Sequence, residues 1–328
     1  MGSRYDIGRF TIPLTVTALI LLSSLFFIPC TASDALRLSL AGQYLRFGVF
    51  FENQWLSRIA SVLILAFFPV MFFAMDRSHP LNIGSAMPLI YSLLILSCRD
   101  ALCLGPVHIA AFFLTWALFF SFRASLEPYN IDNPFVSMLM LSTASLFFAP
   151  LIWMAPLMAA LDNNNSTQKL KTITGSICGL LLPMIFITGI SAIASGYKVI
   201  TEPLLRYLEM VTDIDAGLPQ MQVATITKVL LIVISAIWAA VLFIKTFSTL
   251  DIAAERCHMR CLLYAIWLAL TALLFGNSLG SQTWMLALMP LAFFLYSFFN
   301  IQAQQRNGTF LLAMLLLFTL AERIVILI

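Results

Sequence analysis

An uncharged stretch of 28 residues, Pro134 to Leu161, constrains this chain more than any other feature of its sequence. A helix needs about 20 apolar residues to cross a hydrocarbon core of about 30 Å, so the stretch is long enough to enter a membrane. Pro150 and Pro156 lie inside it, and each removes an intrahelical hydrogen bond and crowds the carbonyl four residues earlier. We therefore expect either a long kinked helix or a helix that breaks near Pro150, followed by the polar run from Asp162 to Ser166.

The rest of the chain has the same apolar character. Hydrophobic residues make up 61% of its 328 residues and charged residues only 10%, whereas soluble domains carry about 25% charged residues. Uncharged runs recur from end to end, and no polar block is long enough to build a soluble core. The sequence predicts an all-α, polytopic integral membrane helix bundle of about nine to eleven membrane segments, in a single domain over residues 1–328.

Two amphipathic segments are predicted to lie at the membrane interface, at about residues 32–55 and 202–211. In the first, Arg37, Arg46 and Glu52 interrupt an apolar pattern, and these charges would need partners if the segment crossed the membrane. A helix packed against the bundle remains an equal alternative for this segment. The run Thr11 to Cys30 exceeds the length of a signal-peptide core, so we expect a first transmembrane helix with a cytoplasmic N-terminus.

The distribution of Lys and Arg bears on the orientation. If each run crossed once, six of these residues would lie inside and nine outside, against the positive-inside rule. If Pro134 to Leu161 instead enters and returns as a re-entrant hairpin, ten lie inside and five outside. The hairpin predicts that Asn163 to Lys171 and Asp251 to Arg260 are cytoplasmic, whereas Lys198 to Gln222 faces outward. A misjudged run at Ile83 to Leu104 would restore the balance equally well.

Arg99, Asp100 and His108 form the first candidate site. An unpaired ionisable residue at mid-bilayer costs at least about 2.5 to 3.5 kcal/mol, so such residues are functional candidates. Together the three could bind a phosphate or relay a proton. The alternatives are a boundary ion pair that caps a short helix and a hydrogen-bonded core histidine.

The second candidate is an external acidic segment that carries Glu202, Glu209, Asp213 and Asp215. Its carboxylate oxygens could hold a divalent cation, although a solvated helix would look the same in sequence. Cys257 and Cys261 lie one turn apart beside His258, but structural zinc sites need four ligands. We therefore predict no metal and no cofactor, and we expect no disulfide framework from the six cysteines.

No soluble-type catalytic motif stands in a suitable context, and no basic tract with interleaved aromatic residues is present. The formal charge of +3 is ordinary for a membrane protein. We expect membrane lipids as partners, with lipid-linked glycan or other envelope proteins as further candidates, and no nucleic acid.

Three segments carry a resemblance to a known family. They are DNPFVSMLMLSTASLFFAPLIWM, KLKTITGSICGLLLPMIFITG and SQTWMLALMPLAFFLYSFF, and they resemble a family of uncharacterised multi-pass bacterial inner-membrane proteins, a domain of unknown function. The resemblance implies a bacterial inner-membrane location and supplies no catalytic residue.

Two classes of function remain open at this point. The first is an envelope-assembly subunit or a carrier of a hydrophobic or glycan-linked substrate. The second is a polytopic glycan polymerase or a lipid-linked-sugar glycosyltransferase, which the polar link followed by a long apolar helix also resembles. The sequence leaves open whether the protein is an enzyme.

Overall fold

The fold is helical throughout the part of the chain that the computed structural model describes. The described residues are 53–78, 87–98, 101–127, 129–165, 168–195, 201–212, 214, 223–246, 252–275, 282–299 and 305–327. They form eleven α-helices and one 3-10 helix, η2, with no strand among them. In chain order these are α4 (Gln54–Ser78), α5 (Met87–Leu96), α6 (Pro106–Leu126), α7 (Asp132–Phe147), η2 (Ala149–Met154), α8 (Ala155–Asn165), α9 (Lys169–Ser195), α10 (Thr201–Thr212), α11 (Val223–Thr246), α12 (Ile252–Leu274), α14 (Gln282–Phe299) and α15 (Gln305–Leu327).

Five of the described helices are long and apolar enough to cross a membrane. Two shorter apolar segments also occur among the described residues, Met87–Leu96 and Trp284–Leu295, the second of them within α14. This confirms the predicted all-helical class and is what a membrane bundle requires, while the total number of segments stays a prediction. The five long spans are Gln54–Phe72, Pro106–Leu126, Lys169–Gly189, Ile226–Lys245 and Glu255–Leu274.

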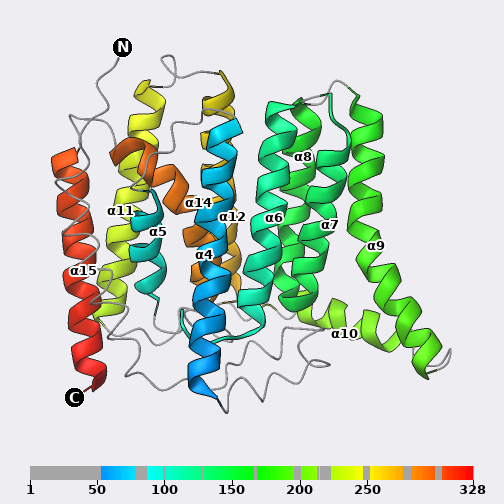
Figure 1. Ribbon diagram of the computed structural model, residues 1–328, viewed down its shortest axis with the longest axis horizontal. Helices are drawn as coiled ribbons and strands as arrows, with labels where there is room; N and C mark the ends of the chain where they lie inside the picture. Colours follow the sequence, from blue (N-terminus) through cyan, green and yellow to red (C-terminus); the bar gives the residue numbers. More distant parts are fainter. Residues whose placement is uncertain are drawn as a thin grey trace.

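The helices form two groups that lie side by side (Figure 1). The first group consists of α6, α7, η2, α8, α9 and α10, and the second of α5, α11, α12, α14 and α15. Helix α4 packs mainly against α6 and also contacts α5. Helix α12 packs against both α6 and η2, and these contacts join the two groups.

The long uncharged stretch breaks where the prolines predicted. Helix α7 ends at Phe147, Phe148 is extended with φ −145° and ψ 92°, and η2 follows at once. Pro150 lies in the first turn of η2 and Pro156 in the first turn of α8, where a proline removes no intrahelical hydrogen bond. The break near Pro150 is confirmed, and the alternative of one long kinked helix is wrong.

The two halves of this stretch form a hairpin that returns to the end from which it came (Figure 1). The Ser137 hydroxyl of α7 donates to the Ala117 carbonyl of α6 at 3.0 Å, and the Ser121 hydroxyl of α6 donates to Asp162 at 2.8 Å. Helix α8 therefore ends beside the C-terminal half of α6, next to the start of α7. The first turn of α7 and the last turn of α8 therefore lie on one side of the bundle, as the re-entrant interpretation requires (Figure 1).

Helix α10 lies across the opposite end of the bundle, roughly perpendicular to the long helices (Figure 1). Its Tyr207 hydroxyl donates to the Ser145 hydroxyl at 2.8 Å, and the Trp153 indole donates to the Val211 carbonyl at 3.2 Å. Leu204, Leu205 and Leu208 are exposed on its outer face. The predicted amphipathic segment at 202–211 is thus confirmed as a helix. The other, at 32–55, lies outside the described residues except for its last three.

One cysteine corrects the sequence analysis. The sequence predicted no disulfide framework and treated the cysteines as small hydrophobic residues, but Cys103 is disulfide-bonded. Cys98, Cys178, Cys257 and Cys261 are free thiols, and all but Cys178 are buried. The spacing of the cysteines in the sequence could not predict this bond, because a disulfide forms only between cysteines whose Cα atoms the fold brings close together.

Helices α7 and α9 approach closely at Gly179. A Cβ atom at this position would clash with the Phe135 carbonyl oxygen, and would lie 3.1 Å from the Leu139 nitrogen and 3.3 Å from the Met138 Cβ. Backbone atoms cannot move aside as a side chain can. Glycine is therefore needed here for the spacing of the two helices and not for its backbone conformation.

We predict that Gly179→Ala destabilises the protein by about 1–3 kcal/mol, the usual cost of overpacking. Gly189→Ala and Gly175→Ala serve as matched controls on α9, because a Cβ would meet nothing within 4 Å at the first and only the Phe135 Cβ at 3.8 Å at the second. Both controls should be neutral or stabilising by up to about 1 kcal/mol, since alanine favours helix. Thermal unfolding in detergent measures all three, and equal effects would contradict the assigned contact.

Candidate functional site

The first predicted site is only partly described by the structure. Arg99 and Asp100 lie outside the described residues, whereas His108 is fully buried in the first turn of α6. Its Nε2 donates to the Ala101 carbonyl at 2.8 Å, and its Nδ1 accepts the Gly105 backbone N–H at 3.2 Å; the network assigns this tautomer. These bonds hold the buried loop before α6, which fits a hydrogen-bonded core histidine.

The second predicted site is also incomplete. Glu209 lies on the exposed side of α10, and Glu202 belongs to the same helix, but its side chain is outside the description, as are Asp213 and Asp215. Among the described residues, no group of three or more His, Cys, Asp and Glu side chains could hold a metal ion. The structure does not bring the members of either predicted site together within its described part.

A different polar cluster, the Arg260–Asp162 network, lies where α6, α8 and α12 meet. The Arg260 guanidinium Nη1 donates to Asp162 Oδ1 at 2.5 Å and to the Ser121 carbonyl at 2.5 Å, and its Nη2 donates to the Leu161 carbonyl at 2.7 Å. Both charged side chains are about 1% exposed. A buried pair of this kind is tolerated only when each charge is matched.

Ser121 and Tyr264 complete the network. The Ser121 hydroxyl donates its one hydrogen to Asp162 Oδ1 at 2.8 Å, so in its 2.6 Å contact with Tyr264 it accepts the phenol hydrogen. It also accepts from Arg260 Nη1 at 2.9 Å, which uses its second lone pair. Within the described residues, Asp162 Oδ2 and Arg260 Nε have no hydrogen-bond partner although both are buried.

The network joins the two helix groups. Asp162 and Ser121 belong to the first group, and Arg260 and Tyr264 belong to the second. A second polar contact between the groups lies further along α12, where the Trp267 indole donates to the Trp153 carbonyl of η2 at 2.7 Å. Hydrogen bonds thus join the groups at two positions on α12, Arg260 and Trp267. The two positions are about 10 Å apart at a rise of 1.5 Å per residue.

This network was not predicted from the sequence, although one signal of it is present there. Cys257, Cys261 and Tyr264 recur at helical spacing and are all fully buried. Arg260 lies three residues after the first and four before the last, so it shares their face. An arginine on the apolar face of a helix needs a partner inside the bundle, and Asp162 is that partner.

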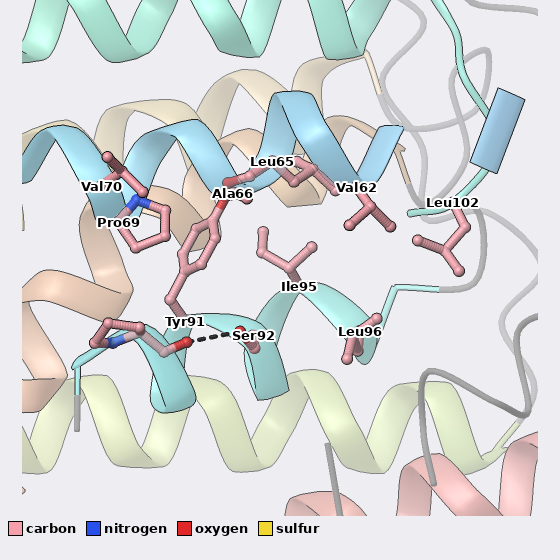
Figure 2. Close-up of a pocket in the computed structure, with 11 residues that line it drawn as sticks. Val62, Leu65, Ala66, Pro69, Val70, Tyr91, Ser92, Ile95, Leu96 and Leu102 are labelled. Atoms are coloured by element: carbon pink, nitrogen blue, oxygen red, sulfur yellow. Dashed lines mark hydrogen bonds between the residues drawn. The ribbon is translucent and has the colours of Figure 1, made fainter. Parts of the chain in front are cut away.

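A groove of about 590 Å³ runs between α4 and α5 (Figure 2). Val62, Ala66 and Val70 recur every four residues on α4 and form its exposed rim. Apart from Ser92 and the Tyr91 hydroxyl, the side chains that line it are apolar, and the Ser92 hydroxyl is bonded to the Pro88 carbonyl at 2.7 Å. The remaining lining residues are Leu65, Pro69, Pro88, Ile95, Leu96 and Leu102.

Tyr91 fixes the floor of this groove. Pro69 has no N–H to donate to the carbonyl four residues earlier, so the Leu65 carbonyl lacks its usual donor within α4. The Tyr91 hydroxyl of α5 donates to that carbonyl at 3.0 Å. The proline and the tyrosine together tie α5 to α4 at this point.

Two basic side chains bond the carbonyls at the C-terminus of α5. The Lys228 ammonium donates to the Ser97 carbonyl at 2.9 Å, and Arg323 donates to the Leu96 carbonyl. Both carbonyls lie at the C-terminus of α5, the negative end of its helix dipole. Arg58 lies one turn before Val62 on α4, and all three cations are at most 6% exposed.

No protein-family model, curated protein or solved structure matches this chain. The Arg260–Asp162 network, the hairpin and the groove are therefore the features that bear on function.

We predict that Asp162→Asn or Arg260→Gln destabilises the protein by about 3–5 kcal/mol, because either change leaves the partner charge buried without its counter-charge. The double variant Asp162→Leu/Arg260→Met should recover most of this loss, since apolar residues of similar size often replace a buried pair without net cost. Thermal unfolding in detergent measures the three variants. Arg256→Gln, at an exposed position one turn earlier on α12, is the matched control. Single and double variants of equal stability would show that the pair has no energetic role.

A second carboxylate lies outside the membrane-spanning helices, directly after α6. Glu127 accepts hydrogen bonds from Arg123 Nη2 at 2.8 Å, from Asn133 at 3.1 Å and from Asn130 at 3.2 Å. Partial burial would raise the pKa of Glu127, but these hydrogen bonds and the charge of Arg123 outweigh it and hold the pKa below its ordinary value of 4.5.

We predict a stability contribution from Glu127 that depends on pH. Because its folded-state pKa is lowered, the contribution is fully present above pH 4.5, the ordinary value, and is lost as the pH falls through the lowered value. Wild type should therefore unfold at a higher temperature than Glu127→Gln at pH 7, and the difference should shrink on acidification below pH 4.5. A difference that stays constant with pH would contradict the lowered pKa.

Proposed function

We propose that the protein is a multi-pass carrier of a hydrophobic or glycan-linked substrate in the bacterial inner membrane, with about nine to eleven membrane segments. One observation carries the proposal: the Arg260–Asp162 network is buried between two helix groups. Ionisable residues inside membrane bundles commonly mark the pathway of a substrate or ion. Carriers work by moving one group of helices against another around such a site.

Interrupted helices support the same proposal. Carriers build their sites from discontinuous helices near the bilayer midplane. Here the α7–η2–α8 hairpin breaks inside the apolar region, and α5 has only 10 residues before a buried loop. At 1.5 Å per residue, α5 covers about half of a hydrocarbon core of about 30 Å.

We also propose an orientation. Cys103 is disulfide-bonded, and such bonds persist in oxidising compartments such as the bacterial periplasm. Its loop and α10 lie at the same end of the bundle (Figure 1). This supports an outward-facing Lys198 to Gln222 and a cytoplasmic position for Asn163 to Lys171 and for Asp251 to Arg260. The ion pair between Asp162 and Arg260 supports placing Asn163 to Lys171 and Asp251 to Arg260 on the same side of the membrane.

Thiol labelling tests the carrier proposal without knowledge of the substrate. Ser121→Cys, placed in the protein with its free native cysteines replaced, should react with a water-soluble maleimide in proteoliposomes, because the two groups must separate there in the transport cycle. Ser137→Cys is the matched control. Both serines are fully buried, but Ser137 lies between α6 and α7 within one group.

The labelling of Ser121→Cys and Ser137→Cys can contradict the carrier proposal in two ways. Equal labelling of the two cysteines, or no labelling of either while the protein remains folded, would contradict a movement between the groups. Trp153→Cys and Trp267→Cys can be added to this protein and joined by a bifunctional maleimide. The cross-link should abolish labelling at position 121, because it ties the two groups together. Thermal unfolding of each variant confirms that the packing is intact.

The enzyme alternative receives no specific support from the described residues. A glycan polymerase or glycosyltransferase would need convergent carboxylates, and of the external acidic segment only the exposed Glu209 side chain is described. We therefore place the carrier first.

A further inference from the structure

We propose that Asp162 binds a proton whenever the two helix groups separate, so that acid opens the site between the groups and ionised Asp162 holds it closed. This inference rests on the movement proposed above and names the ion that accompanies it. A hydronium ion from the water that enters between the groups gives its proton to the Asp162 carboxylate and leaves as water. The reverse transfer returns the proton when the groups close.

Arg260 depends on the first helix group for its hydrogen bonds. It belongs to α12 in the second group, but its acceptors within the described residues are Asp162 Oδ1, the Ser121 carbonyl and hydroxyl, and the Leu161 carbonyl. All of these acceptors lie on α6 or α8, in the first group. Separation of the groups therefore breaks these bonds together and removes the counter-charge of Asp162.

Asp162 cannot remain an unpaired carboxylate inside the protein. Among the described residues, Arg260 is the charged side chain that bonds it, and Asp162 is only 1% exposed. A buried carboxylate without a counter-charge is strongly disfavoured and takes up a proton instead. Arg260 cannot respond by losing its own proton, because a guanidinium stays protonated in proteins. The proton exchange therefore takes place at Asp162.

The carboxylate has an oxygen atom that can receive the proton. Oδ1 accepts from the Ser121 hydroxyl at 2.8 Å and from Arg260, whereas Oδ2 is buried and has no hydrogen-bond partner in the described part of the chain. A buried acceptor without a partner needs an explanation. A proton on Oδ2 leaves the bond from Ser121 in place, so Asp162 and Ser121 stay bonded within the first group in both states.

The charged groups of α6, α7 and α9 near this end of the bundle are exposed or already paired. They are Arg123, which pairs with Glu127 at 2.8 Å, and the exposed Asp132, Lys169 and Lys171. Helix η2 carries no titratable residue. Within the described residues, none of these groups bonds Asp162, so none replaces Arg260 when the groups separate.

Helix α12 carries three neutral titratable groups next to the ion pair. They are a phenol and two thiols, which ordinarily stay protonated at about pH 7: Tyr264, Cys257 and Cys261. Glu255 and Arg256 lie one turn before Arg260, and Arg256 is exposed. His258 instead stacks between Phe243 and Phe293 of the second group. Its imidazole could titrate near neutral pH, so it needs its own control.

Distances between spin labels test the proposal in phosphatidylcholine vesicles, with the free native cysteines replaced. Labels at Leu170→Cys in the first turn of α9 and Ile244→Cys in the last turn of α11 report on different groups, and the native side chains are 78% and 74% exposed. Labels at Leu170→Cys and Leu208→Cys, both in the first group, form the control pair. Double electron–electron resonance measures both pairs from about pH 8 to about pH 5, the range over which one bound proton should shift the equilibrium.

The pair that spans the groups should show a second, longer distance whose population grows on acidification, because the separated state binds one proton more than the closed state. One proton raises the ratio of separated to closed protein by at most about tenfold per pH unit. The control pair should not change. Asp162→Asn has no charge at position 162 at any pH, so it should show the longer distance already at about pH 8 and respond no further.

Two further variants identify the titrating group without relying on the destabilised Asp162→Asn. Glu127→Gln and His258→Gln should keep the pH response of wild type, and thermal unfolding confirms that each variant is folded. Loss of the response in either one would assign the proton to that residue and overturn the role of Asp162. A longer distance whose population does not depend on pH would overturn proton binding but leave the carrier movement intact. A single distance at every pH would overturn both.

Discussion

A charge that is buried away from water must be matched inside the protein, and the Arg260–Asp162 network is where this requirement shapes the described fold most. Arg260 on α12 reaches acceptors on both α6 and α8, so three helices have to meet at one point. Helix α8 can place Asp162 there only because the chain turns back at η2. The hairpin and the ion pair therefore depend on each other.

The parts of this fold that the sequence could predict depend on local chemistry. Pro150 and Pro156 show that a straight helix is impossible, because the defect that a proline causes is confined to one turn. The balance of Lys and Arg favours a return of the hairpin, and amphipathic spacing indicates α10. Each of these signals can be read within a short window of residues.

The network could not be predicted in the same way. In the sequence, Asp162 is the first residue of a polar run that predicts a loop, and Arg260 is the last residue of a segment predicted to be cytoplasmic. They are 98 residues apart, and their meeting depends on how α12 packs against the first helix group. The disulfide at Cys103 and the groove beside α4 are likewise results of packing, which periodicity along one helix does not show.

The bond between Tyr91 and the Leu65 carbonyl has a mechanical consequence. A carbonyl without a partner in hydrocarbon costs several kcal/mol, so α4 depends on a side chain of α5 to repair the defect that Pro69 creates. The two helices can spread at either end of the contact more easily than at the contact itself. Tyr91 thus acts as a fixed pivot, and a bend of α4 at its proline would be transmitted directly to the tilt of α5.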